Sequence, residues 1–226
     1  MMGISVTKYL SPFKEVSIAP LIVFRIIFGA LMFLGTLRFI SKGWIEQLYI
    51  APKHYFGYLG FEWVKPFEGD LIYLPFILLL ISSFFIILGL FYRASAFTFF
   101  LCFTYVELLD KSNYLNHYYF VSLMALIMVF LPANKNLSLD IRIWPKLKSI
   151  ATKQWTINLI KFQLAMVYIF AGIAKLNSDW LFDAQPLKIW LQAHHNIPVV
   201  GSLMQEEWLA YIFSWTGCAY DLFIVF

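Results

Sequence analysis

Long apolar runs dominate this chain, and short polar segments separate them. Several runs approach the roughly 20 residues that a helix needs to cross the hydrocarbon core of a bilayer. They are residues 18–40, 71–91, 94–109, 114–131, 155–175 and 208–226. The run 71–91 contains no charged residue, which makes it the clearest span. The pattern predicts an all-α, multi-pass transmembrane helical bundle of about six spans.

Two of these runs are joined by a tight polar turn, Asp110-Lys111-Ser112-Asn113. Because the runs on either side are short, we expect 94–109 and 114–131 to form a transmembrane hairpin. The run 18–40 is too long for the apolar region of a signal peptide. With no internal repeat or low-complexity linker, the chain is interpreted as a polar N-terminal tail, residues 1–17, followed by one membrane domain, residues 18–226.

Composition excludes other classes of protein. The chain has 226 residues, of which 61% are hydrophobic and 13% charged, and its mean hydropathy is +0.73. A soluble domain has about 45–50% apolar and about 25% charged residues, so a water-soluble globule is excluded. The two cysteines, Cys102 and Cys218, lie in apolar runs, which excludes a disulfide scaffold. The net charge of +4 is mild and scattered, so we expect no nucleic-acid partner.

Basic residues in the polar segments predict the orientation. The tail, the turn at 92–93 and the segment 132–154 together contain eight Lys and Arg, whereas the alternate segments contain five. The positive-inside rule then places the N-terminus in the cytoplasm. Segments 41–70, 110–113 and 176–207 are expected on the extracytoplasmic side.

Ionisable residues inside the spans cost roughly 2.5–3.5 kcal/mol each on insertion scales and therefore indicate a bundle interior or a functional site. With the orientation above they form two layers. Arg25, Lys161 and Asp221 are expected near the cytoplasmic third, where Asp221 would neutralise Arg25 or Lys161 as a structural intramembrane charge. Glu107, His117 and Lys175 are expected near the outer surface.

The span 155–175 carries a polar and small stripe. Its members recur every three or four residues and so share one helical face: Lys161, Ala165, Tyr168, Gly172 and Lys175. Small residues let another helix or a ligand approach the backbone closely. We expect this stripe to face the bundle and to place Lys175 at its outer end.

Structural interpretations of the outer residues stay open at this point. Lys175 also fits a helix C-terminus, where the macrodipole favours a cation and Asp179 is within reach. His117 also fits a hydrogen-bonded residue at a helix start. Glu107 also fits a partner for Lys111 or for the turn backbone.

Motifs for metal or phosphate chemistry are not found. The adjacent residues His194 and His195 point in different directions, and no His or Cys pair has ligand spacing, so no metal site is expected. Neither a glycine-rich phosphate loop nor a nucleophile elbow occurs.

Two of the expected outer segments have further features. Residues 41–70 are dense in aromatic rings, which indicates either a membrane-interface belt or a cap over an outer site. Residues 186–193 fit an interfacial helix that lies flat on the membrane surface.

Three motifs occur in a distinctive order along the chain. They are DKSNYLNHYY at 110–119, PANK with SLD at 132–140, and FQL, YIFAGIAKL and DW between 162 and 180. From about residue 17 onward, this series resembles the vitamin K-dependent gamma-carboxylase family, whose membrane part is the horizontally transferred transmembrane (HTTM) domain. The order of the motifs, more than any single one, makes the resemblance specific.

The resemblance implies a function. Enzymes of that family use reduced vitamin K, oxygen and carbon dioxide to convert protein-bound glutamate to gamma-carboxyglutamate, with vitamin K epoxide as co-product. It implies that Lys175 is the base and that His117, with Asn116 beside it, has a supporting role. Glu107 and Tyr168 are supporting candidates by position alone. The expected partners are membrane lipid, a quinone and an exported protein substrate.

The chain ends within an apolar run, whereas the family's membrane domain continues for several more helices. We therefore expect the N-terminal half of such a domain, which requires a complementing C-terminal half. A non-catalytic quinone-binding or scaffold protein of the same family is the alternative. A transporter is less favoured, because the chain shows no inverted repeat.

Overall fold

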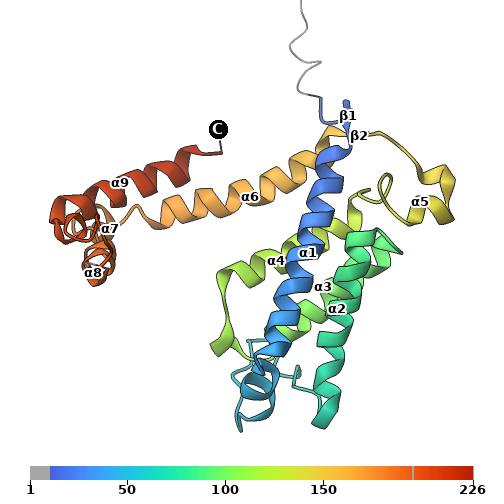
Figure 1. Cartoon of the computed structure of the whole chain (residues 1–226), viewed down its shortest axis with the longest axis horizontal. Coiled ribbons are helices and arrows are strands. Elements are labelled where there is room, and N and C mark those ends of the chain that lie inside the picture. The colour runs from blue at the N-terminus through green and yellow to red at the C-terminus, as the bar shows by residue number, and fades with distance from the viewer. Residues whose placement is uncertain (1–10, 195, 226) are drawn as a thin grey trace, which may run out of the picture. The chain divides into compact units, whose positions relative to one another are not determined.

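The computed structural model describes residues 11–194 and 196–225 and contains two compact units, one ending at Ile160 and one beginning at Lys161 (Figure 1). Helices supply nearly all of the regular structure, so the predicted all-α fold is confirmed. The strands in the described residues are β1 (Glu15–Ser17) and β2 (Ala151–Lys153), which pair antiparallel. Most of the predicted N-terminal tail, residues 1–10, lies outside the described residues.

Four helices build the N-terminal unit, and each packs on the next along the chain. They are α1 (Ala19–Ser41), α2 (Tyr73–Leu88), α3 (Tyr92–Leu108) and α4 (Asn116–Phe130). Shorter turns connect them: η2 (Glu46–Ile50), η3 (Gly69–Ile72), η4 (Lys111–Asn113), α5 (Asp140–Ile143) and η5 (Pro145–Leu147). The expected helical hairpin of α3 and α4 is confirmed, because the two helices pack together across η4.

The C-terminal unit contains most of α6 (Gln154–Ala174), followed by α7 (Ser178–Leu181), α8 (Leu187–Ala193), η6 (Leu203–Gln205) and α9 (Glu207–Phe223). Helices α7 and α8 both pack on α9. Helix α8 coincides with the helix expected at 186–193, although its place on a membrane surface stays a prediction. His195 lies outside the described residues.

Among the described residues, three helical segments are long and apolar enough to cross a membrane: Ala19–Ser41, Gly69–Leu88 and Gln154–Ala174. Helix α4 is apolar but shorter. The exposed face of α1 is apolar over several turns, as expected for a lipid-facing surface; it consists of Val23, Ile27, Leu31 and Leu34. Each of the six predicted runs is helical, while the number that cross the membrane stays a prediction.

The two ends of the N-terminal unit are each held together by backbone contacts. At one end β1 pairs with β2, and the Leu139 and Asp140 amides donate to the carbonyls of Leu88 (2.9 Å) and Gly89 (3.0 Å). At the other end the Lys111 amide donates to the Phe56 carbonyl (2.8 Å). The three segments with the excess of basic residues therefore meet at one end of this unit, although the orientation itself stays a prediction.

A buried guanidinium lies at the basic end, and its Nε and Nη1 have no hydrogen-bond partner among the described residues. Arg25 on α1 is fully buried and donates through Nη2 to the carbonyl of Leu137 (2.5 Å). It lies within the electrostatic influence of the buried Asp140. The expectation that Asp221 neutralises Arg25 or Lys161 is wrong, because Asp221 forms its ion pair with Lys175.

That correction has a geometric cause. The expected depth of Asp221 assumes that the last helix starts at the level where α6 ends. Instead Lys188 of α8 contacts Tyr211 near the start of α9, and Trp180 of α7 contacts Ser214 near its middle. Helix α6 meets α9 nearer the end of α9, from Cys218 to Leu222. Asp221 consequently lies beside Lys175 in the C-terminal unit.

Candidate functional site

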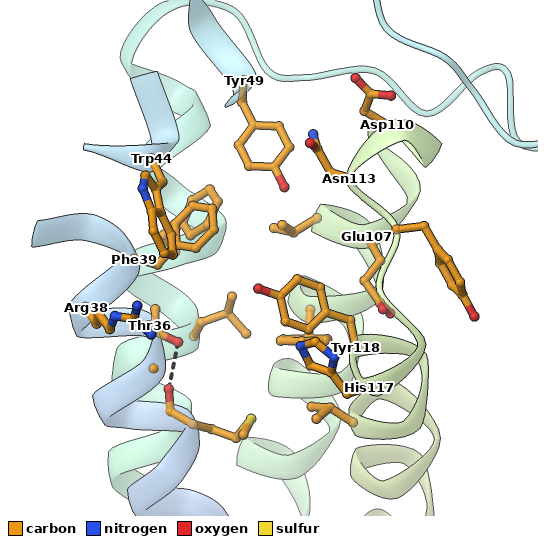
Figure 2. A pocket seen from close by; sticks show the side chains of 18 of the residues that line it. Thr36, Arg38, Phe39, Trp44, Tyr49, Glu107, Asp110, Asn113, His117 and Tyr118 are labelled. Carbon is orange, nitrogen blue, oxygen red and sulfur yellow. Dashed lines mark hydrogen bonds between the residues drawn. The ribbon is translucent and has the colours of Figure 1, made fainter. Parts of the chain in front are cut away.

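A cavity of about 300 Å³ lies within the N-terminal unit, towards the end where segment 42–72 meets the turn between α3 and α4 (Figure 2). Part of its lining is apolar and comes from α1, α2, α3 and α4: Met32, Phe39, Phe76, Leu79, Phe103 and Val121. Polar side chains also line it: Thr36, Arg38, Tyr49, Tyr58, Glu107, Asp110, Asn113, Tyr114, His117 and Tyr118. The cavity is therefore amphipathic.

The turn between α3 and α4 positions two of the predicted residues. Asp110 caps η4, because its Oδ1 accepts from the Ser112 amide (2.9 Å) and from the Phe56 amide (3.3 Å). This fixes the turn, so that Glu107 at the end of α3 and His117 in the first turn of α4 line the same cavity. Figure 2 shows both on the α3 and α4 side, opposite Arg38 of α1.

The two carboxylate oxygens of Glu107 differ in their hydrogen bonding. The Ser122 hydroxyl donates to Oε2, so the partners expected from the sequence, Lys111 and the turn backbone, are not the ones found. Oε1 is buried and has no hydrogen-bond partner among the described residues. A buried carboxylate oxygen without a partner is costly, so its position at a cavity indicates a ligand or water contact.

His117 lies against Tyr118, with ring centroids 4.7 Å apart and planes at 75°. Asn116, predicted beside it, begins α4 and is exposed, and it is not among the residues that line the cavity. Of the two neighbouring motif residues, only the histidine therefore reaches the cavity.

Part of the aromatic segment helps to line this cavity. Trp44, Tyr49 and Tyr58 line it, and the Arg38 guanidinium lies 5.3 Å from the Trp44 ring centroid. Burial, with smaller contributions from nearby tyrosine and carboxylate groups, raises the pKa of Tyr49, which keeps its hydroxyl neutral. Other rings of the segment, such as Trp63, are exposed, so their role as a membrane belt stays a prediction.

Lys175 lies in the C-terminal unit, directly after the last residue of α6. It forms an ion pair with Asp221, and the two side chains are 22% and 14% exposed. The Lys175 Nζ also lies 5.2 Å from the centroid of the Trp180 ring, whose Nε1 donates to the Ser214 carbonyl (2.8 Å). The ion-pair partner of Lys175 is therefore Asp221 and not Asp179, the partner that the sequence suggested.

The predicted stripe on α6 packs against α9. Tyr168 contacts Tyr220 through an edge-to-face ring pair with centroids 6.1 Å apart. A Cβ at Gly172 would lie 2.7 Å from the Leu222 side chain, so only glycine permits this approach. Lys161, at the start of the stripe, is exposed.

Substituting Gly172 with valine should separate α6 from α9, because the added atoms would overlap Leu222. We expect a loss of about 1–3 kcal/mol in stability, as for overpacked sites, and faster acylation of Lys175 as its ion pair with Asp221 opens. Thermal unfolding in detergent and mass-spectrometric labelling would measure both effects. Gly217→Val is the matched control, because nothing lies within 4 Å of a Cβ built there; equal effects of both changes would contradict the packing argument.

Long apolar helices and polar side chains gathered within them define a helical membrane protein. A family model, the HTTM domain, matches residues 13–226. The chain therefore belongs to the HTTM domain family. No solved structure matches it.

Proposed function

We propose that this protein is a quinol-dependent membrane enzyme with chemistry of the gamma-carboxylase type. The HTTM domain associates the chain with that family, and the amphipathic cavity supports a site for a quinol. Its volume lies at the lower end of the range for small-molecule sites, about 300–1,000 Å³.

The cavity residues fit a quinol in three respects. Aromatic and aliphatic side chains suit a flat ring with an apolar tail. The free Oε1 of Glu107 suits a hydroxyl donor. His117 offers a ring nitrogen that can donate or accept a hydrogen bond.

The proposed reaction balances in two coupled parts. A quinol and O₂ give a quinone epoxide and water, so the quinol is oxidised and oxygen is reduced. A glutamyl γ-carbon forms a bond to CO₂, which becomes a new carboxylate, and the proton that the carbon loses is released to water. A bound quinol would supply the reducing electrons for this coupling.

Lys175 is the proposed proton acceptor, by its match to the family motif. To act as a base, the Lys175 amine must first release the proton that it holds in the ion pair with Asp221. The ammonium that re-forms when it accepts a proton is stabilised by Asp221 and by the Trp180 ring. General base catalysis of this kind contributes about 10²- to 10⁴-fold to a rate.

We also propose a multi-pass arrangement with the cavity on the extracytoplasmic side, where exported proteins would present glutamate. The positive-inside bias supports this orientation, and so does the meeting of the basic segments at the opposite end of the N-terminal unit.

The test uses the full chain in lipid nanodiscs with vitamin K hydroquinone, O₂, labelled bicarbonate and a glutamyl peptide. We expect epoxide and labelled peptide, and a fall of about 10²-fold or more in both for Lys175→Ala. Lys161→Ala is the matched control, because it removes an exposed lysine from the same helix face. Quinol binding without epoxide would instead support the non-catalytic quinone-binding protein.

A further inference from the structure

The cavity in the N-terminal unit is lined by two carboxylates, and they differ in what they already bind. Asp110 uses Oδ1 to accept two backbone amides, those of Ser112 and Phe56, and so maintains the turn. Glu107 accepts one hydroxyl, that of Ser122, on Oε2. Its other oxygen is buried and unpartnered among the described residues. Glu107 is thus the carboxylate available to a bound molecule.

The chemistry of that oxygen favours a donor. An ionised carboxylate can only accept hydrogen bonds. A carbonyl oxygen can also only accept them, whereas a hydroxyl can donate one. A hydroxyl of the bound molecule, placed against Glu107, would donate to Oε1. A carbonyl in that place would leave Oε1 and the carbonyl oxygen without hydrogen bonds, and the two oxygens would repel each other.

We infer that Glu107 makes this cavity selective for the reduced, hydroxyl-bearing form of a quinone over the oxidised, carbonyl-bearing form. The inference rests on the proposed quinol site and adds the residue that distinguishes its two redox states. Such selectivity lets the site release the oxidised product and rebind the reduced substrate. A site without the carboxylate would bind both forms to similar extents, because their rings and tails are alike.

The experiment measures binding of menadiol and menadione separately by equilibrium dialysis, with the full chain in nanodiscs under anaerobic conditions. We expect the wild type to bind menadiol about tenfold or more tightly, since a hydrogen bond to a charged group is strong. In Glu107→Gln the ratio should fall close to one, because an amide both donates and accepts. Glu68→Gln makes the same change at an exposed carboxylate and should leave the ratio unchanged.

Ser122→Ala provides a second variant that keeps the carboxylate and removes its existing donor. It should retain the preference for menadiol, and loss of the preference there would overturn the inference. An equal ratio of menadiol to menadione affinity in the wild type and in Glu107→Gln would overturn the inference as well. If both compounds still bind in that case, the proposed quinol site would remain supported. If the wild type binds neither compound, the inference and the proposed function both fail.

Discussion

Asp140→Ala is expected to destabilise the N-terminal unit by about 3–5 kcal/mol, the usual cost of removing one member of a buried charged network. The Asp140 carboxylate accepts from the amides of Phe91 (2.7 Å) and Tyr92 (3.1 Å) and from Nδ2 of Asn134 (2.6 Å). The first two amides begin α3, which has no side-chain cap of its own. The substitution therefore leaves buried donors unpaired and Arg25 without its nearby negative charge.

Thermal unfolding in detergent, followed by tryptophan fluorescence, would measure the loss. Asp140→Asn should fall between the wild type and Asp140→Ala, because it keeps one acceptor oxygen but no charge. Asp70→Ala is the control, since that carboxylate is exposed and its removal should change the midpoint little. An Asp140→Ala midpoint equal to that of Asp70→Ala would show that the carboxylate does not cap α3.

Much of the helical layout follows from the sequence, because apolar runs must be helical where a membrane offers no partner for the backbone. The hairpin of α3 and α4 could be predicted from its polar turn. The segment around Asp140 could not, since it looks like an ordinary loop between spans. Its role depends on hydrogen bonds to residues 48 and 49 positions away, and hydrophobic periodicity carries no information on such contacts.

The candidate site could be predicted in part. The sequence indicated Glu107 and His117 as outer residues, and the structure brings them to one cavity. The part played by Tyr49 and Tyr58 was open, because a dense aromatic segment fits a membrane belt equally well. Arg38 carried no distinguishing signal, since a basic residue at a helix end is common.

The partner of Lys175 could not be predicted from the sequence, for a different reason. The stripe on α6 correctly indicated a closely packed face, yet the identity of the partner depended on where α9 crosses it. Counting residues down from Trp208 gave Asp221 the partners Arg25 or Lys161, whereas the structure pairs it with Lys175. Helices α7 and α8 lie between α6 and α9 in the chain and pack on α9, and such short helices leave no clear periodic pattern in the sequence.

Gly89→Ala is expected to cost about 3–5 kcal/mol, because two effects add at this position. Gly89 ends α2 with φ at +62°, a left-handed conformation that costs other residues roughly 1–2 kcal/mol. An added Cβ would also lie only 1.7 Å from Nη1 of Arg25 and 2.4 Å from Cβ of Ser138. The buried guanidinium would have to move, and its hydrogen bond to Leu137 would be lost or distorted.

Gly69→Ala separates the two effects. Gly69 has a similar φ of +57°, but nothing lies within 4 Å of a Cβ built there. This control should therefore show the backbone strain alone, and its unfolding midpoint in detergent should fall clearly less than that of Gly89→Ala. Equal midpoints would mean that Arg25 adjusts freely, which would contradict a rigid role for it at the basic end. Combining Gly89→Ala with Arg25→Met tests the same point, because shortening the side chain should recover part of the loss.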